Sequence, residues 1–346
     1  MQPVSYSKTT SKNIKIKYIV LTVLAFLGVV FLGIAVWLMV ALNTPKDPSE
    51  PKEAAFTVKA NSGIEVIADN LVKANLISDR NLFILYAKFG PSRGNLQPGI
   101  YLFSPAMSLS KITDTMGEGR VSTRKVTFQE GLNINEMAAK WAKAGLGDAQ
   151  SFVVATKPPN TYSQEFLRYR SNKDSLEGYL FPATYEILVT TTPQQQINDM
   201  LDAFAAQVLP KLPSEVANTT KLNEVVTLAS IVEKEANTAE DRRLVAGVFY
   251  NRLRLGMKLE SDVTINYVTG KTATQAADLK IDSPYNSYLY KGLPPTPICS
   301  PGLDAILATV SPTQSEYLFF LADKTGKVHY AKNLTEHEQN IDKYLN

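Results

Sequence analysis

The stretch Leu222-Asn-Glu-Val-Val-Thr-Leu-Ala-Ser-Ile-Val-Glu-Lys-Glu-Ala236 dominates the second half of the chain. Its apolar residues recur three and four positions apart, and this spacing predicts a helix with one apolar stripe. At about 100° per residue, Glu233 falls inside the stripe, whereas Glu235 falls on the other side of the helix beside Leu228 and Ile231. The stripe consists of Leu222, Val225, Val226, Ala229, Val232 and Ala236. Both acids therefore have apolar neighbours.

The apolar neighbours of Glu233 and Glu235 bear on acid chemistry. Low polarity disfavours the charged form of a carboxyl group, so its pKa rises and it can stay protonated near neutral pH, as a general acid must. The alternative is a pair of surface acids that bridge to Lys234, Arg242 or Arg243 near a helix end. Periodicity alone does not choose between the two acids.

The segments around this helix indicate a mixed α+β fold. Thr192-Pro193 predicts the start of a helix that runs towards Val208, and a further helix is predicted over about residues 240–253. Leu176–Pro182 is typical of an aromatic loop or an edge strand. Tyr317–Leu321 predicts a buried strand near the end of the chain. We expect two α+β domains behind an N-terminal membrane helix.

The first half of the chain contains a strand followed by a helix twice, 70 positions apart. Residues 56–59 alternate as in a strand and residues 64–71 have helical spacing, and the same order recurs over 126–128 and 134–141. Identical pairs in this register are Thr57/Thr127, Ile64/Ile134, Ala68/Ala138, Lys73/Lys143, Ala74/Ala144 and Leu76/Leu146. A repeat of this size suits a small binding module. Between the copies, the pattern predicts a strand over 98–103 and a helix from Leu109 that ends at Gly117.

Tyr18–Leu42 is an uncharged stretch of 25 residues. As a helix it would be roughly 37 Å long, enough to cross a hydrocarbon core of about 30 Å. Lys8, Lys12, Lys15 and Lys17 precede it without any acid, whereas basic and acidic residues mix after it. Positive flanks stay cytoplasmic, so we expect residues 1–17 to form a cytoplasmic tail, residues 18–42 to span the membrane, and a Pro-rich linker over 43–54 to lift the exported part off the bilayer.

Composition excludes several classes of function. The chain has 36 Lys and Arg against 33 Asp and Glu, a formal net charge of +3, and no dense basic patch, which argues against nucleic acid as a ligand. One cysteine and two histidines leave no pattern for a zinc site or an iron–sulfur cluster. We therefore expect no metal and no cofactor.

Five blocks of the second half resemble the MltG (YceG-like) endolytic murein transglycosylase family. They are Leu228–Glu235, Phe249–Leu253, Gly256–Asp262, Ser283–Tyr288 and Gly292–Pro295, with Glu177–Pro182 ahead of them and Glu336-His337 behind. The resemblance implies an enzyme of the bacterial cytoplasmic (inner) membrane, with a LysM-like glycan-binding region over 55–150 and a YceG-like catalytic domain over 151–346. It assigns the essential acid to the second carboxylate of the Glu-Lys-Glu block, which is Glu235.

The resemblance further implies cleavage of peptidoglycan glycan strands between N-acetylmuramic acid and N-acetylglucosamine, with 1,6-anhydro ends as products. It suggests that nascent strands are terminated and that peptidoglycan synthases are partners. Asp262 is expected in a turn with a supporting role, because one acid suffices when the muramyl C6 hydroxyl attacks C1. The expected substrate contacts are Glu177, Tyr179, Asn251, Arg252, Asp262, Tyr267, Ser283, Tyr285, Asn286 and Tyr288.

Three positions depart from the pattern of the family. Ala183 replaces the usual Asp, Val263 the usual Pro, and Thr296 the usual Gly. These departures keep a second hypothesis open, in which both domains bind glycan without cleaving it and the chain is a scaffold for cell-wall synthesis. Because Glu235 is present, the sequence favours the enzyme.

Overall fold

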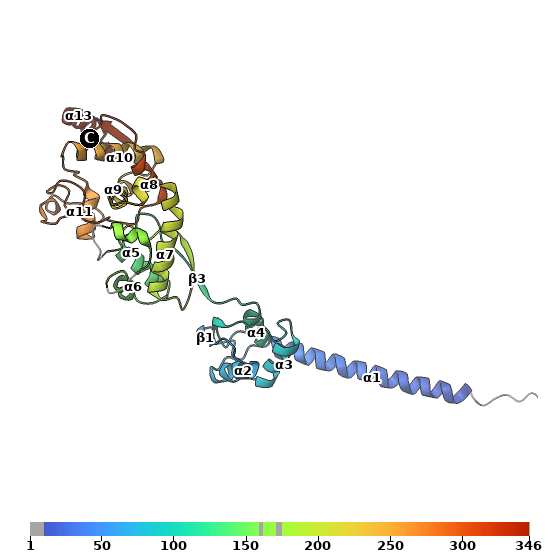
Figure 1. The fold of residues 1–346 in the computed structure, drawn as a ribbon. Helices are drawn as coiled ribbons and strands as arrows, with labels where there is room; N and C mark the ends of the chain where they lie inside the picture. Colours follow the sequence, from blue (N-terminus) through green and yellow to red (C-terminus); the bar gives the residue numbers. More distant parts are fainter. Residues whose placement is uncertain (1–9, 159–161, 171–174, 346) are drawn as a thin grey trace, which may run out of the picture. The chain divides into compact units, whose positions relative to one another are not determined.

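The computed structural model describes residues 10–158, 162–170 and 175–345 of the chain. They divide into two compact units, Met1–Ser122 (unit 1) and Thr123–Asn346 (unit 2). Figure 1 shows the elements of both units, coloured along the sequence. Of the expected cytoplasmic tail, residues 1–9 lie outside the described part.

Unit 1 begins with α1 (Thr10–Asn43), an uninterrupted helix (Figure 1). Within it, Lys17–Asn43 is long and apolar enough to cross a membrane, and its most apolar stretch is not buried inside the protein. The structure therefore contains an apolar helix where the sequence predicts the anchor over 18–42. The last turns of α1 pack against the core of unit 1 through Leu38, Ala41 and Leu42.

The rest of unit 1 is a small sheet with three helices. Strand β1 (Ala54–Val58) pairs antiparallel with β2 (Gly99–Phe103), in a register that places Phe56 opposite Tyr101. The helices are α2 (Ile64–Lys73), α3 (Arg80–Phe89) and α4 (Leu109–Gly117). Both strands, α2 and α4 confirm the sequence pattern, whereas α3 was not predicted. The largest core side chains, Tyr101, Phe83 and Phe103, are fully buried.

The segment expected as a Pro-rich linker over 43–54 contacts the rest of unit 1 at its start. Pro45 forms a β-bridge with Ser108. The N–H of Asp47 donates to the carbonyl of Pro105 at 2.9 Å. Backbone pairing therefore ties the start of this segment to the residues just before α4.

Unit 2 also begins with a strand, but that strand pairs with a distant one. Strand β3 (Thr123–Thr127) pairs antiparallel with β4 (Thr184–Leu188), so that Thr123 lies opposite Leu188. Between them lie α5 (Ile134–Lys143), α6 (Ala149–Ala155) and η1 (Glu165–Tyr169). After them come α7 (Pro193–Gln207), η2 (Leu209–Lys211), α8 (Ser214–Ala217), α9 (Lys221–Glu235), α10 (Ala239–Arg254), α11 (Asp262–Thr269), η3 (Asp278–Lys280), α12 (Leu303–Val310), β5 (Phe319–Ala322), β6 (Val328–Ala331) and α13 (Leu334–Tyr344).

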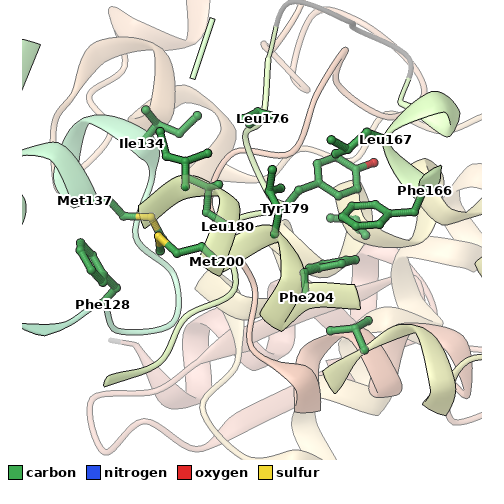
Figure 2. Packing of buried hydrophobic residues seen from close by; sticks show 14 of the residues in the cluster. Phe128, Ile134, Met137, Phe166, Leu167, Leu176, Tyr179, Leu180, Met200 and Phe204 are labelled. Carbon is green, nitrogen blue, oxygen red and sulfur yellow. The ribbon is translucent and has the colours of Figure 1, made fainter. Parts of the chain in front are cut away.

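The second strand–helix repeat belongs to unit 2 and not to the first module. Phe128, Met137 and Trp141 share one hydrophobic cluster with residues of α7 and α9. Figure 2 shows Phe128 and Met137 in this cluster with Met200 and Leu180. The boundary between the units therefore falls after Ser122 rather than after residue 150, because β3 finds its partner in β4.

Helix α9 is buried on all sides rather than along one stripe. Every residue from Val225 to Val232 is buried, including Leu228 and Ile231 on the face opposite the predicted stripe. One side of α9 belongs to the large cluster that contains Val226 and Ala229. The other side forms a second cluster with α10 and the segment around Ile298. The helix thus begins its buried course in the centre of unit 2 and ends at Glu235, which is partly exposed.

Candidate active site

Glu235 ends α9 and lies against the loop that precedes α11. Its Oε1 accepts a hydrogen bond from the Ser261 hydroxyl at 2.5 Å. Burial raises the pKa of Glu235, the Ser261 hydrogen bond opposes this rise, and the negative charge of Asp262 adds to it. The net shift is upward, so the carboxyl favours the protonated form that a general acid needs.

Both carboxylate oxygens of Glu233, two positions earlier, accept hydrogen bonds from other residues of unit 2. Its Oε1 accepts from Arg242 Nη2 at 2.8 Å, and only 6% of the glutamate side chain is exposed. Its Oε2 accepts from the N–H of Gly302 at 2.9 Å. Burial also raises the pKa of Glu233, but the Gly302 amide and Arg242 oppose that rise. The ion-pair alternative left open by the sequence is therefore what the structure has at Glu233, and not at Glu235.

A buried hydroxyl network holds Ser261 in place. The Ser261 N–H donates to Ser287 Oγ at 3.0 Å, and Ser287 Oγ lies 2.9 Å from Thr264 Oγ1. All three residues are buried. Because the network fixes the backbone of Ser261, the hydroxyl presented to Glu235 has a defined position. Ser261 was not singled out from the sequence, although it stands inside the Gly256–Asp262 block.

Arg252 donates hydrogen bonds to the loop that precedes Ser261. Its Nη1 donates to the carbonyls of Lys258 and Leu259 at 3.2 and 3.0 Å and to Glu260 Oε2 at 3.0 Å. Glu260 has a φ of 50°, a left-handed conformation that is uncommon for a residue with a side chain. The arginine therefore holds a strained loop, and its side chain is buried rather than open to a ligand.

Asp262 and Tyr288 lie beside the Glu235 carboxyl. Asp262 is the first residue of α11 rather than a turn residue after a strand, and residues 257–261 form no strand. The prediction of a turn was wrong because Ser261 begins a helix at this point. The Tyr288 hydroxyl donates to Asp262 Oδ1 at 2.7 Å. Burial, that hydrogen bond and the charges of Asp262 and Glu235 all raise the pKa of Tyr288.

A cleft of about 900 Å³ is lined by residues adjacent in sequence to this cluster, while Glu235 and Asp262 are not among its lining residues. Its lining includes Lys234, next to Glu235, and Val263, next to Asp262. Three expected substrate contacts face it, namely Tyr267, Ser283 and Tyr285, together with Asn133, Asn135, Glu136 and Asn266, which were not predicted. A cleft of this size is in the range of small-ligand sites, and its mixture of amides, hydroxyls and aromatic rings suits a sugar chain.

Two tyrosines form one aromatic wall of this cleft. The rings of Tyr267 and Tyr285 lie 5.1 Å apart. The Tyr285 hydroxyl is 2.7 Å from Thr296 Oγ1, so this departure from the family pattern supports a wall residue. Val263, another departure, packs in the second hydrophobic cluster, and Ala183 accepts the N–H of Phe128 at 3.0 Å through its carbonyl.

Glu177 contacts Tyr267 of the cleft wall and is 4% exposed. Both its carboxylate oxygens are 3.2 Å from the N–H of Ile134, at the start of α5, and one accepts from the Tyr267 hydroxyl at 3.5 Å. Burial raises the pKa of Glu177 to about 8, while the Ile134 amide and Tyr267 oppose the rise. Glu177 therefore ties α5 to the aromatic wall.

The remaining expected contacts are scaffold residues in this structure. Tyr179 is in the core, with its ring 5.9 Å from Phe166 and 5.5 Å from Phe204 (Figure 2). Asn251 donates to the carbonyls of Ser315 and Tyr317, and Asn286 donates to those of Leu279 and Ile281. Within the described residues, no group of three or more His, Cys, Asp or Glu side chains could hold a metal ion.

Comparisons with known proteins agree with this architecture. A model of the YceG-like family matches residues 56–343. The "endolytic murein transglycosylase" of Streptococcus pneumoniae serotype 2 (strain D39) is 33% identical over 96% of this chain, which spans 66% of that relative's length. The Bacillus subtilis (strain 168) protein of the same name is 32% identical over 88% of each chain. A crystal structure of a yceG-like protein from Listeria monocytogenes has a TM-score of 0.57 and 34% identity over 83% of this chain and 99% of that one. The chain belongs to the YceG-like family.

Proposed function

We propose that this protein is a membrane-anchored endolytic lytic transglycosylase. It cleaves peptidoglycan glycan strands between N-acetylmuramic acid and N-acetylglucosamine and leaves 1,6-anhydro-muramyl ends. The observation that carries the proposal is the contrast in α9: Glu235 has a raised pKa, accepts a hydrogen bond from the Ser261 hydroxyl and follows the cleft residue Lys234, while Glu233 is bound by Arg242 and Gly302. The names of the pneumococcal and Bacillus relatives support the same activity.

Glu235 performs both proton transfers in this mechanism. Its protonated carboxyl donates to the glycosidic oxygen, and an oxocarbenium-like transition state develops at the muramyl C1. The C6 hydroxyl of the same sugar then attacks C1, and the carboxylate of Glu235 accepts its proton. Because nucleophile and electrophile belong to one ring, the attack gains from proximity and needs no water.

Ser261 and Asp262 set the protonation state of Glu235 in opposite directions. The Ser261 hydroxyl stabilises the carboxylate that forms after the first transfer, whereas the charge of Asp262 favours the protonated acid that begins the reaction. Asp262 itself is bound by the Tyr288 hydroxyl. This arrangement suits one acid with two supporting groups rather than a pair of hydrolytic carboxylates.

The apolar helix and the lysines before it support the rest of the proposal. The N-terminus is cytoplasmic, and the rest of unit 1 and all of unit 2 are exported. The enzyme therefore acts beside the bacterial cytoplasmic membrane, where glycan strands are made. The part of the expected 55–150 region that lies in unit 1, after α1, is a LysM-like glycan-binding module. The enzyme terminates nascent strands, with peptidoglycan synthases as its partners.

Digestion of purified, uncross-linked glycan strands by the full chain in detergent tests this function. The wild type should shorten the strands, and Glu235→Gln should bind them without cleavage. Binding without cleavage by the wild type would favour the scaffold, in which the same cleft only holds glycan.

A further inference from the structure

The end of the membrane helix is fixed to unit 1. The last turns of α1 contribute Leu38, Ala41 and Leu42 to the packing of the unit's core. The Ser110 hydroxyl donates to Asn43 Oδ1 at 3.0 Å, at the last residue of the helix. With Pro45 bridged to Ser108, the module begins directly where the span ends. With α1 as the proposed membrane anchor, the rest of unit 1 adjoins the level of the lipid headgroups.

A groove of about 260 Å³ lies between the end of α1 and the module. Trp37 lines it and stands six residues before Asn43, about 9 Å inside the end of the span at the rise of a helix. This places the groove at the depth of the headgroups and first methylenes, where tryptophan is enriched. The apolar wall consists of Trp37, Leu76, Ile77, Leu82, Met107 and Leu109.

A single cation lines the groove in the described part of the chain, and this is Lys46. Its Nζ donates to Asn75 Oδ1 at 2.5 Å, and because this acceptor is neutral, the contact does not cancel the charge of the ammonium group. The one acid in the lining, Asp79, is engaged as the N-cap of α3, where it accepts the N–H groups of Asn81 and Leu82. Lys46 can therefore hold an anionic group above the apolar wall.

We propose that this groove binds one phospholipid of the surrounding bilayer, with an acyl chain along the apolar wall and the phosphate at Lys46. The groove is continuous with the lipid-facing surface of α1, since Trp37 lines it and is 61% exposed. Its volume is too small for a partner helix, whose diameter is about 10–12 Å, but suits one acyl chain. The bound lipid fixes the module against the membrane. This inference rests on the proposed membrane anchoring.

Photocrosslinking of the full chain in nanodiscs tests the inference. The nanodiscs contain phosphatidylcholine and phosphatidylglycerol, part of the latter with a diazirine on its acyl chain, and adducts are mapped by peptide mass spectrometry. We expect adducts on residues 17–43 and also on residues 76–82 and 107–109. Lys46→Glu should lower the module adducts about fivefold relative to those on the span, because a basic residue becomes acidic beside an anionic lipid. Lys59→Glu, on an exposed lysine outside the groove lining, should leave the ratio unchanged.

The two sets of adducts separate the inference from the anchoring on which it rests. Adducts confined to residues 17–43 would overturn the lipid site and leave the anchor intact. An absence of adducts on residues 17–43 would overturn the anchor and the lipid site together. A ratio that Lys46→Glu does not change would overturn the phosphate contact.

Discussion

Glu233 and Glu235 lie on two sides of the last turn of α9 and have different neighbours. On one side, Glu233 is buried against Arg242 and the amide of Gly302. On the other side, Glu235 has a hydroxyl donor, Ser261, and an acidic neighbour, Asp262. The comparison teaches that the same residue type, two positions apart, serves stability where an arginine and a main-chain amide bind it and serves chemistry where a hydroxyl and an acidic neighbour adjoin it.

Glu235→Gln should give the largest effect. The amide keeps the shape of the side chain but loses the titratable proton, so we expect glycan cleavage to fall by about 10³-fold or more. The melting temperature of unit 2 should stay near that of the wild type, or rise, because a buried group that favours neutrality has been made neutral. Cleavage rates and thermal unfolding measured on the same preparation check both parts. Cleavage retained near the wild-type level would remove Glu235 from the mechanism.

Glu233→Gln should show the opposite pattern. It leaves Arg242 without its anion in a mostly buried site, so we expect a loss of about 2–4 kcal/mol in the free energy of unfolding. The folded protein should cleave glycan within a few-fold of the wild-type rate. Urea unfolding followed by the fluorescence of Trp141, which is buried in unit 2, measures the first part. If this variant were stable and inactive, the roles assigned to the two sides of α9 would be exchanged.

Ser261→Ala sharpens the account of the catalytic side. The Ser261 hydrogen bond lowers the pKa of Glu235, so its removal should raise that pKa and move the alkaline limb of the pH–rate profile to higher pH. The rate at the optimum should fall about tenfold, because the carboxyl loses its fixed orientation. Ser261→Thr keeps the hydroxyl and should restore the wild-type limb. An unshifted limb in Ser261→Ala would show that the serine does not act on the acid.

Glu177→Gln should have the smallest effect on chemistry and should change the pH dependence of stability instead. The pKa of Glu177 is raised from 4.5 to about 8, so the folded state keeps a proton that the unfolded state releases between these values. Wild-type stability should therefore fall as pH rises through this window, by a few kcal/mol in all. The glutamine variant should lose less stability between about pH 5 and about pH 8. Trp141 fluorescence during thermal unfolding at both pH values provides the comparison, and parallel slopes for the two proteins would contradict it.

Local pattern predicted most of the helices, because their signals lie within a few residues. The helix α7 follows Thr192-Pro193, and Thr192 forms a capping box with Gln195 as its start signal implies. The unit boundary could not be predicted in this way. It depends on the pairing of β3 with β4, more than 50 residues away in the chain, and local alternation carries no information about such a partner.

The candidate site was predictable to the extent that its residues stand in the quoted blocks. Ser283 and Tyr285, which stand in such a block, line the cleft, and so does Tyr267, which stands outside the blocks; their contact with substrate stays a prediction. Asn251 and Arg252 stand in equally distinctive blocks, yet they bind main-chain carbonyls of the protein. A residue's place in a block of the family does not show whether its side chain contacts a ligand or contacts the rest of the protein. Burial decides that question, and burial depends on the tertiary structure.

The central claim, that Glu235 acts as the single acid of an intramolecular reaction, is tested most directly by cleaving glycan strands in ¹⁸O-water and analysing the new muramyl ends by mass spectrometry. The account predicts 1,6-anhydro ends without ¹⁸O from the wild type, and the same kind of product, formed more slowly, from Asp262→Asn. Reducing ends that carry ¹⁸O in the wild type and disappear in Asp262→Asn would show a two-carboxylate hydrolase and contradict the mechanism.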